Sequence, residues 1–256
     1  MKKLQRTLTL PTAIAISIGG MLSGIFVLPG IAVGITGSSV WLAFLVAALC
    51  ILPAVLSKSE LATAMPKSGG TYVYIERAFG PLFGTVSGLG LWLSLLLKSA
   101  FSLVGLSAYL YVIVQIDAGL SKIIALISLG LILILNVFGV KKVGNTQLAI
   151  VSVSVISLIL VVLFGTNSFD STLLSPVFSN GNHGFISAVA FLYISYAGVT
   201  KVAAVAGEIK SPEKNLPRAM LISLFLITTV YVFVALILVG NIDPSVLSKD
   251  IRPIYT

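Results

Sequence analysis

The stretch Ile18–Gly30, IGGMLSGIFVLPG, lies in the middle of the first long apolar segment of the chain and holds four glycines, a serine and a proline. In a helix interior, glycine is about 1 kcal/mol and proline about 3 kcal/mol less favourable than alanine. Irregular backbone at membrane depth is tolerated only where it is buried in protein or lines a cavity. The stretch therefore predicts either an unwound binding segment or a close helix contact, because Gly20-x-x-x-Gly24 is also a helix-packing motif.

Composition places the whole chain in a membrane. Of its 256 residues, 57% are hydrophobic and 9% are charged, whereas about a quarter of the residues of a soluble domain are charged. The single cysteine, Cys50, and the single histidine, His183, lie apart from other metal-ligating residues. We therefore expect an all-α polytopic membrane protein with the lipid bilayer as a partner and without a metal or cofactor. No catalytic set of nucleophile, base and acid points to an enzyme.

A membrane-spanning helix needs about 20 predominantly apolar residues. Seven segments meet this requirement, and they are Leu10–Ile35, Val40–Leu61, Phe83–Ile116, Ser121–Phe138, Thr146–Phe164, Phe185–Ala206 and Ala219–Val239. With the N-terminus inside, eleven of the sixteen basic residues fall in cytoplasmic segments, as the positive-inside rule requires. The sequence thus predicts a multi-pass protein of the cell membrane with a cytoplasmic N-terminus. The net charge of +8 reflects this topology, and no basic run with interleaved aromatics indicates nucleic acid.

The sixth span carries a second candidate interruption. It contains FLYISYAGVTKVAAVAGE, Phe191–Glu208, whose centre at Ser195–Thr200 again combines serine, glycine, threonine and valine. Paired interruptions at equivalent positions of two halves are the best sequence indication of a transporter binding site. A break in the first span would free amides near Ser23 that suit a carboxylate, and carbonyls near Gly20 that suit an ammonium group. A zwitterion fits a site that offers both.

Four stretches resemble the amino acid–polyamine–organocation superfamily of transporters. They are SGIFVLPG in the first span, MPKSGGTYVYIERAFGP after the second, NVFGVKKVGNTQ before the fifth and AGEIKSPEKNLPRAM after the sixth. The resemblance implies a five-plus-five inverted-repeat fold, with residues 1–165 as the first repeat and residues 166–256 as an incomplete second repeat. It also implies alternating access, with the substrate held between broken helices.

Matching positions to that family assigns residue roles. Ser23 and Gly24, with Ile25 beside them, would meet the substrate carboxylate. The carbonyl of Gly20 and those near Ile194 and Ala197 would meet its amine. The pocket for the substrate side chain would be lined by Ser195, Tyr196, Gly198 and Thr200. The chain departs from the family pattern at Leu22, where a glycine is frequent, and it has no acidic gate near the second interruption.

Two lysines and a serine are candidates for coupling or gating. Lys98 lies mid-span, where a charged side chain costs about 2.5–3.5 kcal/mol on insertion scales. One hypothesis gives it the place of a coupling cation or proton carrier, and the other makes it a structural lysine bonded to carbonyls of the first span. Lys201 follows the second interruption and either snorkels inward or contributes to a gate. Ser154 stands where some family members carry a coupling lysine. Either a proton or sodium remains open as coupling ion.

The chain ends after the seventh span, so the resemblance leaves three further helices to be supplied by a longer gene product or by another chain. The first function hypothesis is secondary active transport of an amino acid, favouring a neutral one. The alternatives are a truncated non-transporting membrane subunit, a transporter of polyamines or cationic amino acids, and an ion pathway.

Overall fold

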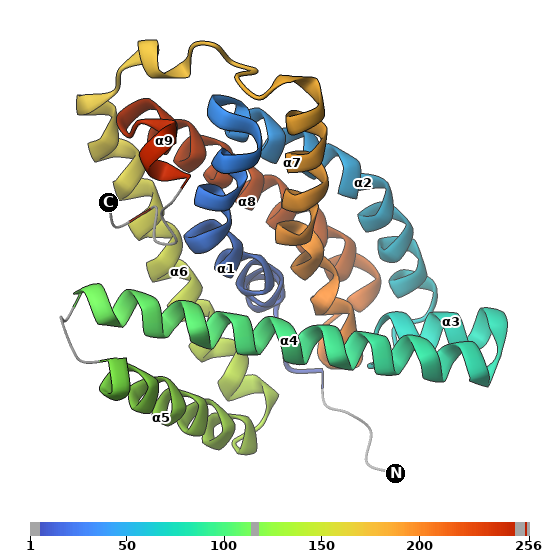
Figure 1. Ribbon diagram of the computed structural model, residues 1–256. Helices are drawn as coiled ribbons and strands as arrows, with labels where there is room; N and C mark the ends of the chain where they lie inside the picture. The colour runs from blue at the N-terminus through green and yellow to red at the C-terminus, as the bar shows by residue number, and fades with distance from the viewer. Residues whose placement is uncertain (1–5, 114–117, 249–253, 255–256) are drawn as a thin grey trace.

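The computed structural model describes residues 6–113, 118–248 and 254, which form helices joined by short connections (Figure 1). The long helices are α1 (Leu10–Thr36), α2 (Val40–Ala64), α4 (Pro81–Ile113), α5 (Ala118–Val137), α6 (Val140–Gly165), α7 (Gly181–Tyr196) and α8 (Pro212–Asn241). The short elements are α3 (Thr71–Phe79), α9 (Pro244–Leu247) and the 3-10 helices η1 (Gly37–Ser39), η2 (Thr166–Ser168), η3 (Ser171–Leu174) and η4 (Ala197–Glu208). Within the described ranges, extended pairing is limited to one isolated parallel bridge between Leu8 and Ile209.

The structure confirms an all-α protein built from apolar helices of membrane-spanning length. Six described segments are long and apolar enough to cross a membrane, and the first of them, Leu10–Ala64, contains both α1 and α2. Each predicted span coincides with one of the long helices, except that the sixth span is divided between α7 and η4. The predicted end of the third span at Ile116 lies outside the described residues.

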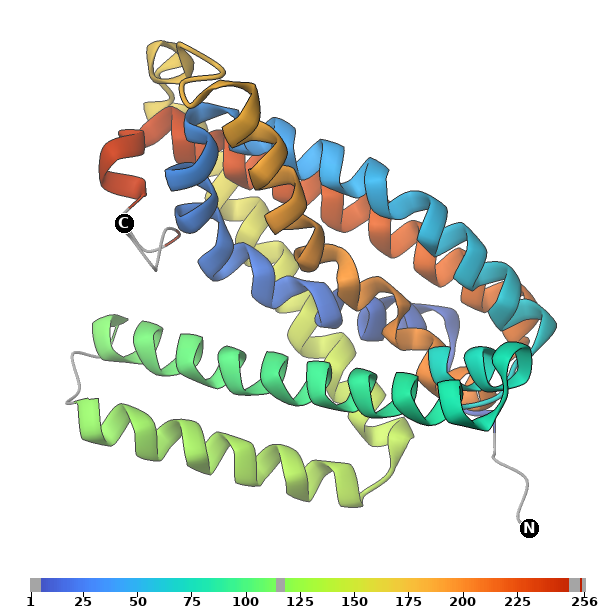
Figure 2. The ribbon, with the colours of Figure 1, turned by 45° about the vertical axis from the view of Figure 1, so that its right-hand side comes forward.

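Four helices form the packed centre of the molecule. α2 lies along α8, α1 contacts both of them, and α7 packs against α1 and α2 (Figures 1 and 2). Three aromatic rings fill the space between them, with the Tyr231 ring centroid 5.1 Å from that of Phe44 and 5.4 Å from that of Tyr196. All three side chains are fully buried. This centre fixes the position of α1 relative to α7.

Helices α4 and α5 run side by side and form a separate layer beside the packed centre (Figures 1 and 2). The exposed fractions of Leu89, Trp92 and Leu97 on α4 are 62%, 61% and 59%. In a membrane such apolar side chains face lipid or further helices, since both are apolar environments. The layer meets the centre chiefly where α4 crosses α1.

The turn between α1 and α2 is tight because of one glycine. Gly37 has φ of 70°, a conformation that glycine adopts without a steric penalty. The side-chain amide of Asn180 donates to the carbonyls of Gly34 and Ile35 at 3.2 and 3.1 Å. These bonds satisfy carbonyls that the end of α1 leaves without an intrahelical partner.

At the opposite end of α1, the chain is tied to the loop that follows η4. The amide of Leu8 donates to the carbonyl of Glu208 at 2.9 Å, and the amide of Lys210 donates to the carbonyl of Leu8 at 2.9 Å. The loop after α2 joins the same region, because the amide of Gly69 donates to the carbonyl of Ala204 at 3.0 Å. The ends of α1, α2 and η4 are therefore connected by backbone hydrogen bonds.

Candidate functional site

Helix α1 crosses the α7–η4 segment at backbone contact. A Cβ atom built on Gly198 would overlap the carbonyl group of Gly20, and one built on Gly20 would lie 2.8 Å from the carbonyl oxygen of Gly198. One turn further along α1, a Cβ on Gly24 would lie 3.1 Å from the Cβ and Oγ atoms of Ser195. Only residues without a side chain permit this approach, so the glycines of both predicted interruptions meet each other.

The predicted unwinding of the first span is wrong for this structure. Helix α1 continues without interruption from Leu10 to Thr36, through Gly20, Gly24 and Pro29. Packing explains the difference, because the glycines let α1 lie directly against η4 and most helical stability comes from such tertiary contacts. Breaking the helix would also free backbone groups that need new partners at membrane depth.

The second interruption is present as a change of helix type. The α-helical hydrogen-bonding pattern of α7 ends at Tyr196, and the following twelve residues, Ala197–Glu208, form the 3-10 helix η4. Runs of 3-10 helix longer than three or four residues are uncommon and often mark a functional hinge. The change falls within the predicted segment Ser195–Thr200. The one non-helical residue inside η4 is Val205, beyond that segment.

Although α1 is continuous, three of its carbonyls accept hydrogen bonds from side chains of other helices. Lys98 Nζ of α4 donates to the Gly20 carbonyl at 2.7 Å, and the Tyr231 hydroxyl of α8 donates to the Met21 carbonyl at 2.6 Å. The Tyr109 hydroxyl of α4 donates to the Phe26 carbonyl. In the reverse direction, the Ser17 hydroxyl donates to the carbonyl of Val199 in η4 at 2.8 Å. A continuous helix thus has backbone carbonyls that bind polar groups of other helices, a property expected of a broken helix.

A cavity of about 700 Å³ lies between α1, α4 and α7. It is bounded mostly by apolar side chains, and its described lining residues are Ser23, Gly24, Leu28, Ile31, Gly90, Leu93, Ser94, Leu97, Lys98, Phe101, Phe191, Ile194, Ser195 and Ala197. The hydroxyl of Ser195 is buried and has no hydrogen-bond partner in the described part of the chain. An unsatisfied buried hydroxyl costs about 1–3 kcal/mol. We call this space the central cavity.

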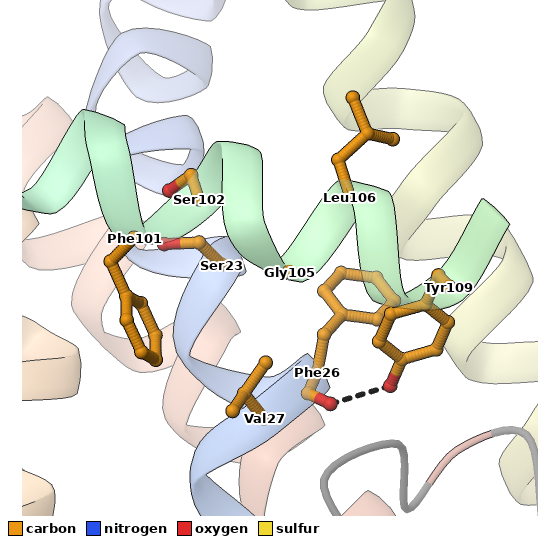
Figure 3. Close-up of a pocket in the computed structure, with 8 residues that line it drawn as sticks. All are labelled: Ser23, Phe26, Val27, Phe101, Ser102, Gly105, Leu106 and Tyr109. Atoms are coloured by element: carbon orange, nitrogen blue, oxygen red, sulfur yellow. Dashed lines mark hydrogen bonds between the residues drawn. The ribbon is translucent and has the colours of Figure 1, made fainter. Parts of the chain in front are cut away.

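A second cavity, of about 410 Å³, follows α1 and α4 away from α7 (Figure 3). Ser23 and Phe101 line both cavities. The far wall of the second cavity holds Tyr109, whose ring lies edge-on to that of Phe26 at a centroid distance of 6.0 Å. We call this space the α1–α4 cavity. It continues from the central cavity along α4, so the two are neighbouring compartments.

The structure brings many of the predicted site residues together. The predicted residues that line the central cavity are Ser23, Gly24, Lys98, Ile194, Ser195 and Ala197. Gly20 lies under the Lys98 ammonium group, and Ile25 is fully buried in the packed centre. The arrangement therefore combines α1 and α7, as the sequence indicates, with α4.

Other predicted residues point elsewhere. The Tyr196 hydroxyl donates to the Phe44 carbonyl at 3.0 Å, on the α2 side. The Thr200 hydroxyl accepts from Lys58 Nζ at 3.2 Å, also on the α2 side. Gly198 is occupied by its contact with α1. None of these three residues is among the described lining of the central cavity.

Ser154 lies on the other side of α1. Its hydroxyl donates to the carbonyl of Ile150 at 2.9 Å, within α6. It lines a cavity of about 290 Å³ between α1, α5 and α6, which also contains Gly19 and Gln147. Ser154 is therefore separated by α1 from the central cavity and from Lys98.

Sequence reasoning missed most of the α4 wall. Apart from Lys98, the α4 residues in the cavity lining are Gly90, Leu93, Ser94, Leu97 and Phe101. Gly90, Ser94 and Phe101 lie eight, four and three residues from Lys98, a spacing that places side chains on the same face of a helix. Leu93 and Leu97, five and one residues away, flank that face. Once Lys98 is suspected, this spacing is the signal that finds the wall. Phe191, three residues before Ile194 on α7, is found in the same way.

The described residues contain no group of three or more His, Cys, Asp or Glu side chains that could hold a metal ion. Polar chemistry in the central cavity is instead supplied by three serine hydroxyls and one ammonium group, those of Ser23, Ser94, Ser195 and Lys98. These groups donate or accept hydrogen bonds without a nucleophile and base in contact. The arrangement suits reversible binding of a small polar molecule.

Residues 12–250 match the sequence profile of a family described as Amino acid permease. The serine/threonine exchanger SteT of Bacillus subtilis is 28% identical over 239 residues, which cover 90% of this chain and 54% of the exchanger. The branched-chain amino acid permease BcaP of Lactococcus lactis is 27% identical over 278 residues, which cover 99% of this chain and 60% of the permease. The inner membrane transport protein YbaT of Escherichia coli is 25% identical, with 95% of this chain and 58% of that protein covered. The chain spans little more than half the length of the curated relatives that it matches.

Proposed function

The chain belongs to the amino acid permease family, and we propose that it moves a neutral amino acid across the cell membrane as a secondary active transporter that works by alternating access. In this proposal residues 1–165 form the first repeat of a five-plus-five inverted-repeat fold, and residues 166–256 form part of the second. The substrate occupies the central cavity between α1, α4 and α7. Family membership supports a transporter rather than an enzyme.

The observation that carries the proposal is the buried hydroxyl of Ser195 in the wall of the central cavity. Ser195 lines a space of about 700 Å³, and its buried hydroxyl has no partner among the described residues. Ligand sites are concave and mostly apolar, with a few polar groups that fix the orientation of the ligand. Ser195 and Ser23 lie on the two helices whose interruptions were predicted, and an amino acid offers both a donor and an acceptor to their hydroxyls.

The lining of the cavity supports a substrate with a small or apolar side chain. Leu28, Ile31, Leu93, Phe191 and Ile194 supply aliphatic and aromatic surface. Burying apolar surface contributes about 25 cal/mol per Å², so this wall favours an uncharged side chain. The names of two relatives mention serine and threonine in one case and branched-chain amino acids in the other. Serine, threonine, valine, leucine and isoleucine are therefore the first five amino acids to test.

Alternating access requires that one end of the pathway closes while the other opens. Hydrogen bonds join Leu8 to Glu208 and to Lys210, and Gly69 to Ala204, at one end of the helices. With the proposed cytoplasmic N-terminus, this end faces the cytoplasm and is closed. Opening the cytoplasmic side would break these bonds, and the long 3-10 helix η4 supplies a segment able to change shape. The driving ion in this proposal is a proton or sodium.

The proposal is tested by uptake of radiolabelled amino acids into liposomes that contain the complete gene product. The expected result is saturable uptake of at least one of serine, threonine, valine, leucine and isoleucine, competed by unlabelled substrate. Repeating the assay with and without a proton gradient, and with sodium replaced by choline, identifies the driving ion. Uptake that does not exceed that of empty liposomes for any of the twenty amino acids would overturn the proposal. A signal that rises linearly with concentration and is not competed would indicate an ion-pathway type of permeation instead.

A further inference from the structure

A third space of interest, of about 450 Å³, lies at the end of the molecule where α1 begins. Its lining comes from parts of the chain that are far apart in sequence: residues 6–9 and Thr12 around the start of α1, Asn145 of α6, and Lys210 in the loop before α8. We call this space the basic pocket. It shares no described lining residue with the central cavity, so the two are separate sites.

Backbone hydrogen bonds hold two sides of the basic pocket together. The amide of Leu8 donates to the Glu208 carbonyl at 2.9 Å, and the amide of Lys210 donates to the Leu8 carbonyl at 2.9 Å. The side-chain amide of Asn215 in α8 donates to the Lys210 carbonyl at 2.6 Å. The backbone of Lys210 is therefore fixed by partners on both sides. A site that is already ordered loses less conformational entropy when a ligand binds.

Helix α6 closes the third side of the pocket through a glycine contact. A Cβ atom built on Gly144 would lie 2.6 Å from Cγ2 of Thr12 and 3.1 Å from Cδ2 of Leu8. Gly144 therefore lets α6 approach the start of α1, and the next residue, Asn145, lines the pocket. The hydroxyls of Thr9 and Thr12, which also line it, form a hydrogen bond of 3.1 Å with each other. Neutral polar groups thus surround the basic side chains.

The charge of the lining is wholly positive. Its described residues include two basic side chains, Arg6 and Lys210, and neither Asp nor Glu. Both basic residues are exposed, so a ligand from solvent or from the membrane surface is able to reach them. Arginine presents five N–H donors in a planar fork that fits two oxygens of a phosphate, and a lysine ammonium group presents three donors. Two positive charges beside neutral donors favour a multiply oxygenated anion.

The pocket lies at the boundary of the apolar segments. Arg6 comes just before the segment that begins at Leu10, and Lys210 comes just after the segment Gly181–Glu208. The two charges therefore lie at the depth of the lipid headgroups, outside the hydrocarbon core. With the proposed cytoplasmic N-terminus, they face the leaflet that carries anionic phospholipids, and basic pockets between membrane helices on that side bind phosphate-bearing headgroups.

We propose that the basic pocket binds a phosphate group, with the Arg6 guanidinium on two of its oxygens and the Lys210 ammonium group neutralising further charge. The Asn145 amide donates to the same group, and the hydroxyl pair of Thr9 and Thr12 keeps one proton to donate. Phosphate is offered both by the headgroup of an anionic phospholipid and by free inorganic phosphate. This inference goes beyond the proposed function, because the pocket lies apart from the central cavity and its binding requires no transport.

Lipid and phosphate binding by the purified complete gene product in detergent tests the proposal. Native mass spectrometry compares dioleoyl phosphatidylglycerol with dioleoyl phosphatidylcholine, whose choline group cancels the phosphate charge, and isothermal titration calorimetry measures inorganic phosphate at the same ionic strength. The variants are Arg6→Gln and Lys210→Gln. Lys214→Gln is the matched control, because it removes an equal charge from an exposed residue at the start of α8 that is outside the described lining.

We expect the unchanged protein to bind phosphatidylglycerol at least about 5-fold more tightly than phosphatidylcholine, and Arg6→Gln and Lys210→Gln each to weaken phosphatidylglycerol binding about 5-fold, which corresponds to about 1 kcal/mol for each basic residue. Lys214→Gln leaves the preference unchanged, because salt screens an exposed charge that does not contact the ligand. Size-exclusion profiles and melting temperatures equal to those of the unchanged protein establish that each variant is folded.

The outcomes distinguish the two sources of phosphate. A preference for phosphatidylglycerol that depends on Arg6 and Lys210, and not on Lys214, supports the pocket with a lipid headgroup as its ligand. Binding of inorganic phosphate that is lost in the same two variants, without a preference between the lipids, supports the pocket with free phosphate as its ligand.

Three results would overturn the proposal. They are an equal loss of binding in all three variants, which indicates a response to total charge, a preference that survives in both pocket variants, and the absence of both lipid preference and phosphate binding. None of them bears on amino acid uptake, so the liposome assay tests the proposed function separately.

Discussion

The α1–η4 crossing and the α4–α5 layer contribute opposite walls to the same cavity, and they are built in opposite ways. In an apolar stretch of eighteen consecutive residues in α8, which supports the crossing, 56% of the residues are buried, whereas none is buried in the corresponding stretch of α4. The crossing is held by glycine contacts and by Tyr231 from the packed centre. The α4 wall meets α1 through Lys98 and Tyr109. The α1–η4 crossing is therefore held by close packing, whereas α4 is attached to α1 by a few polar contacts.

This difference indicates where movement is least costly. Close-packed interiors respond to any change of volume, while segments with few buried contacts open with small free energies. We therefore expect α4 to move relative to α1 in the proposed transport cycle, and the α1–η4 crossing to stay together. Lys98 lies at the junction of the two walls, since it lines the cavity and donates to the Gly20 carbonyl of α1.

The largest expected effect comes from adding one methyl group to the crossing. Gly198→Ala places a Cβ into the backbone of Gly20, where no flexible side chain is able to give way. Overpacking of this kind costs about 1–3 kcal/mol or more, so we expect a fall in melting temperature and in the yield of monodisperse protein. The matched change in the outer layer is Gly130→Ala on α5, where a Cβ has no neighbour within 4 Å.

Gly130→Ala should leave melting temperature unchanged or raise it slightly, since alanine is about 1 kcal/mol better than glycine in a helix. Both variants are compared by size-exclusion chromatography and thermal unfolding in the same detergent. Equal stability of the two variants would show that the α1–η4 contact is not as close as the structure has it.

A smaller effect is expected from the tyrosine hydroxyls that bind α1. Tyr231→Phe removes a fully buried donor to the Met21 carbonyl, and Tyr109→Phe removes a partly buried donor to the Phe26 carbonyl. Loss of a buried hydrogen bond costs about 0.5–1.5 kcal/mol, and up to about 3 kcal/mol if a group is left unsatisfied. Thermal unfolding should show a larger loss for Tyr231→Phe. A larger loss of stability for Tyr109→Phe would contradict the distinction between the closely packed α1–η4 crossing and the weakly attached α4 wall.

The smallest effect concerns the loop beyond the packed centre. The Asp170 carboxylate accepts from the side chain and the amide of Thr172, and these bonds hold the pKa of Asp170 below its ordinary value of 3.8. A lowered pKa in the folded state contributes stability above the ordinary value, and this contribution is lost as pH falls through the folded pKa. Helix η3 should therefore loosen only below about pH 3.8, and not between pH 5 and 8.

Hydrogen exchange of the Thr172 amide tests this expectation. After correction for the intrinsic pH dependence of exchange, protection should be constant from pH 8 to pH 5 and fall below pH 4. Asp170→Asn should remove this step, because its side chain does not titrate. A loss of protection near pH 6, or a step that persists in Asp170→Asn, would exclude the Asp170 carboxylate as its cause.

The sequence predicted the membrane helices well because that signal is local. Span length and apolar composition determine α1, α2 and α8 without reference to other segments. The residues Ser195–Thr200 also indicated the change from α7 to η4. The break in α1 was predicted wrongly, since helix propensity is local while the contact between Gly20 and Gly198 joins positions far apart in the chain.

The cavity was predicted only in part for the same reason. Ser23, Gly24 and Ser195 carry recognisable motifs, and the structure places them in one wall. The opposite wall on α4 has no such motif apart from Lys98. The hydrogen bond from Lys98 to Gly20 spans 78 positions, and no spacing rule for a single helix reaches that far. Lys98 was recognisable in the sequence because a charged side chain is costly at mid-span. Its hydrogen-bond partner, the Gly20 carbonyl, was identified only from the folded structure.

Thiol protection measures whether an amino acid binds in the central cavity. Ser94→Cys places a thiol in the central cavity, and Ser102→Cys places one in the neighbouring α1–α4 cavity. Both are made in a Cys50→Ser background, because Cys50 is exposed, and the rate of labelling by a charged methanethiosulfonate reagent is measured. We expect a saturating concentration of a transported amino acid to slow labelling of the Ser94→Cys variant at least about 5-fold, and a half-saturating concentration to slow it about 2-fold, with a smaller effect for Ser102→Cys. Equal labelling rates of the Ser94→Cys variant with and without a transported amino acid would contradict binding in the central cavity.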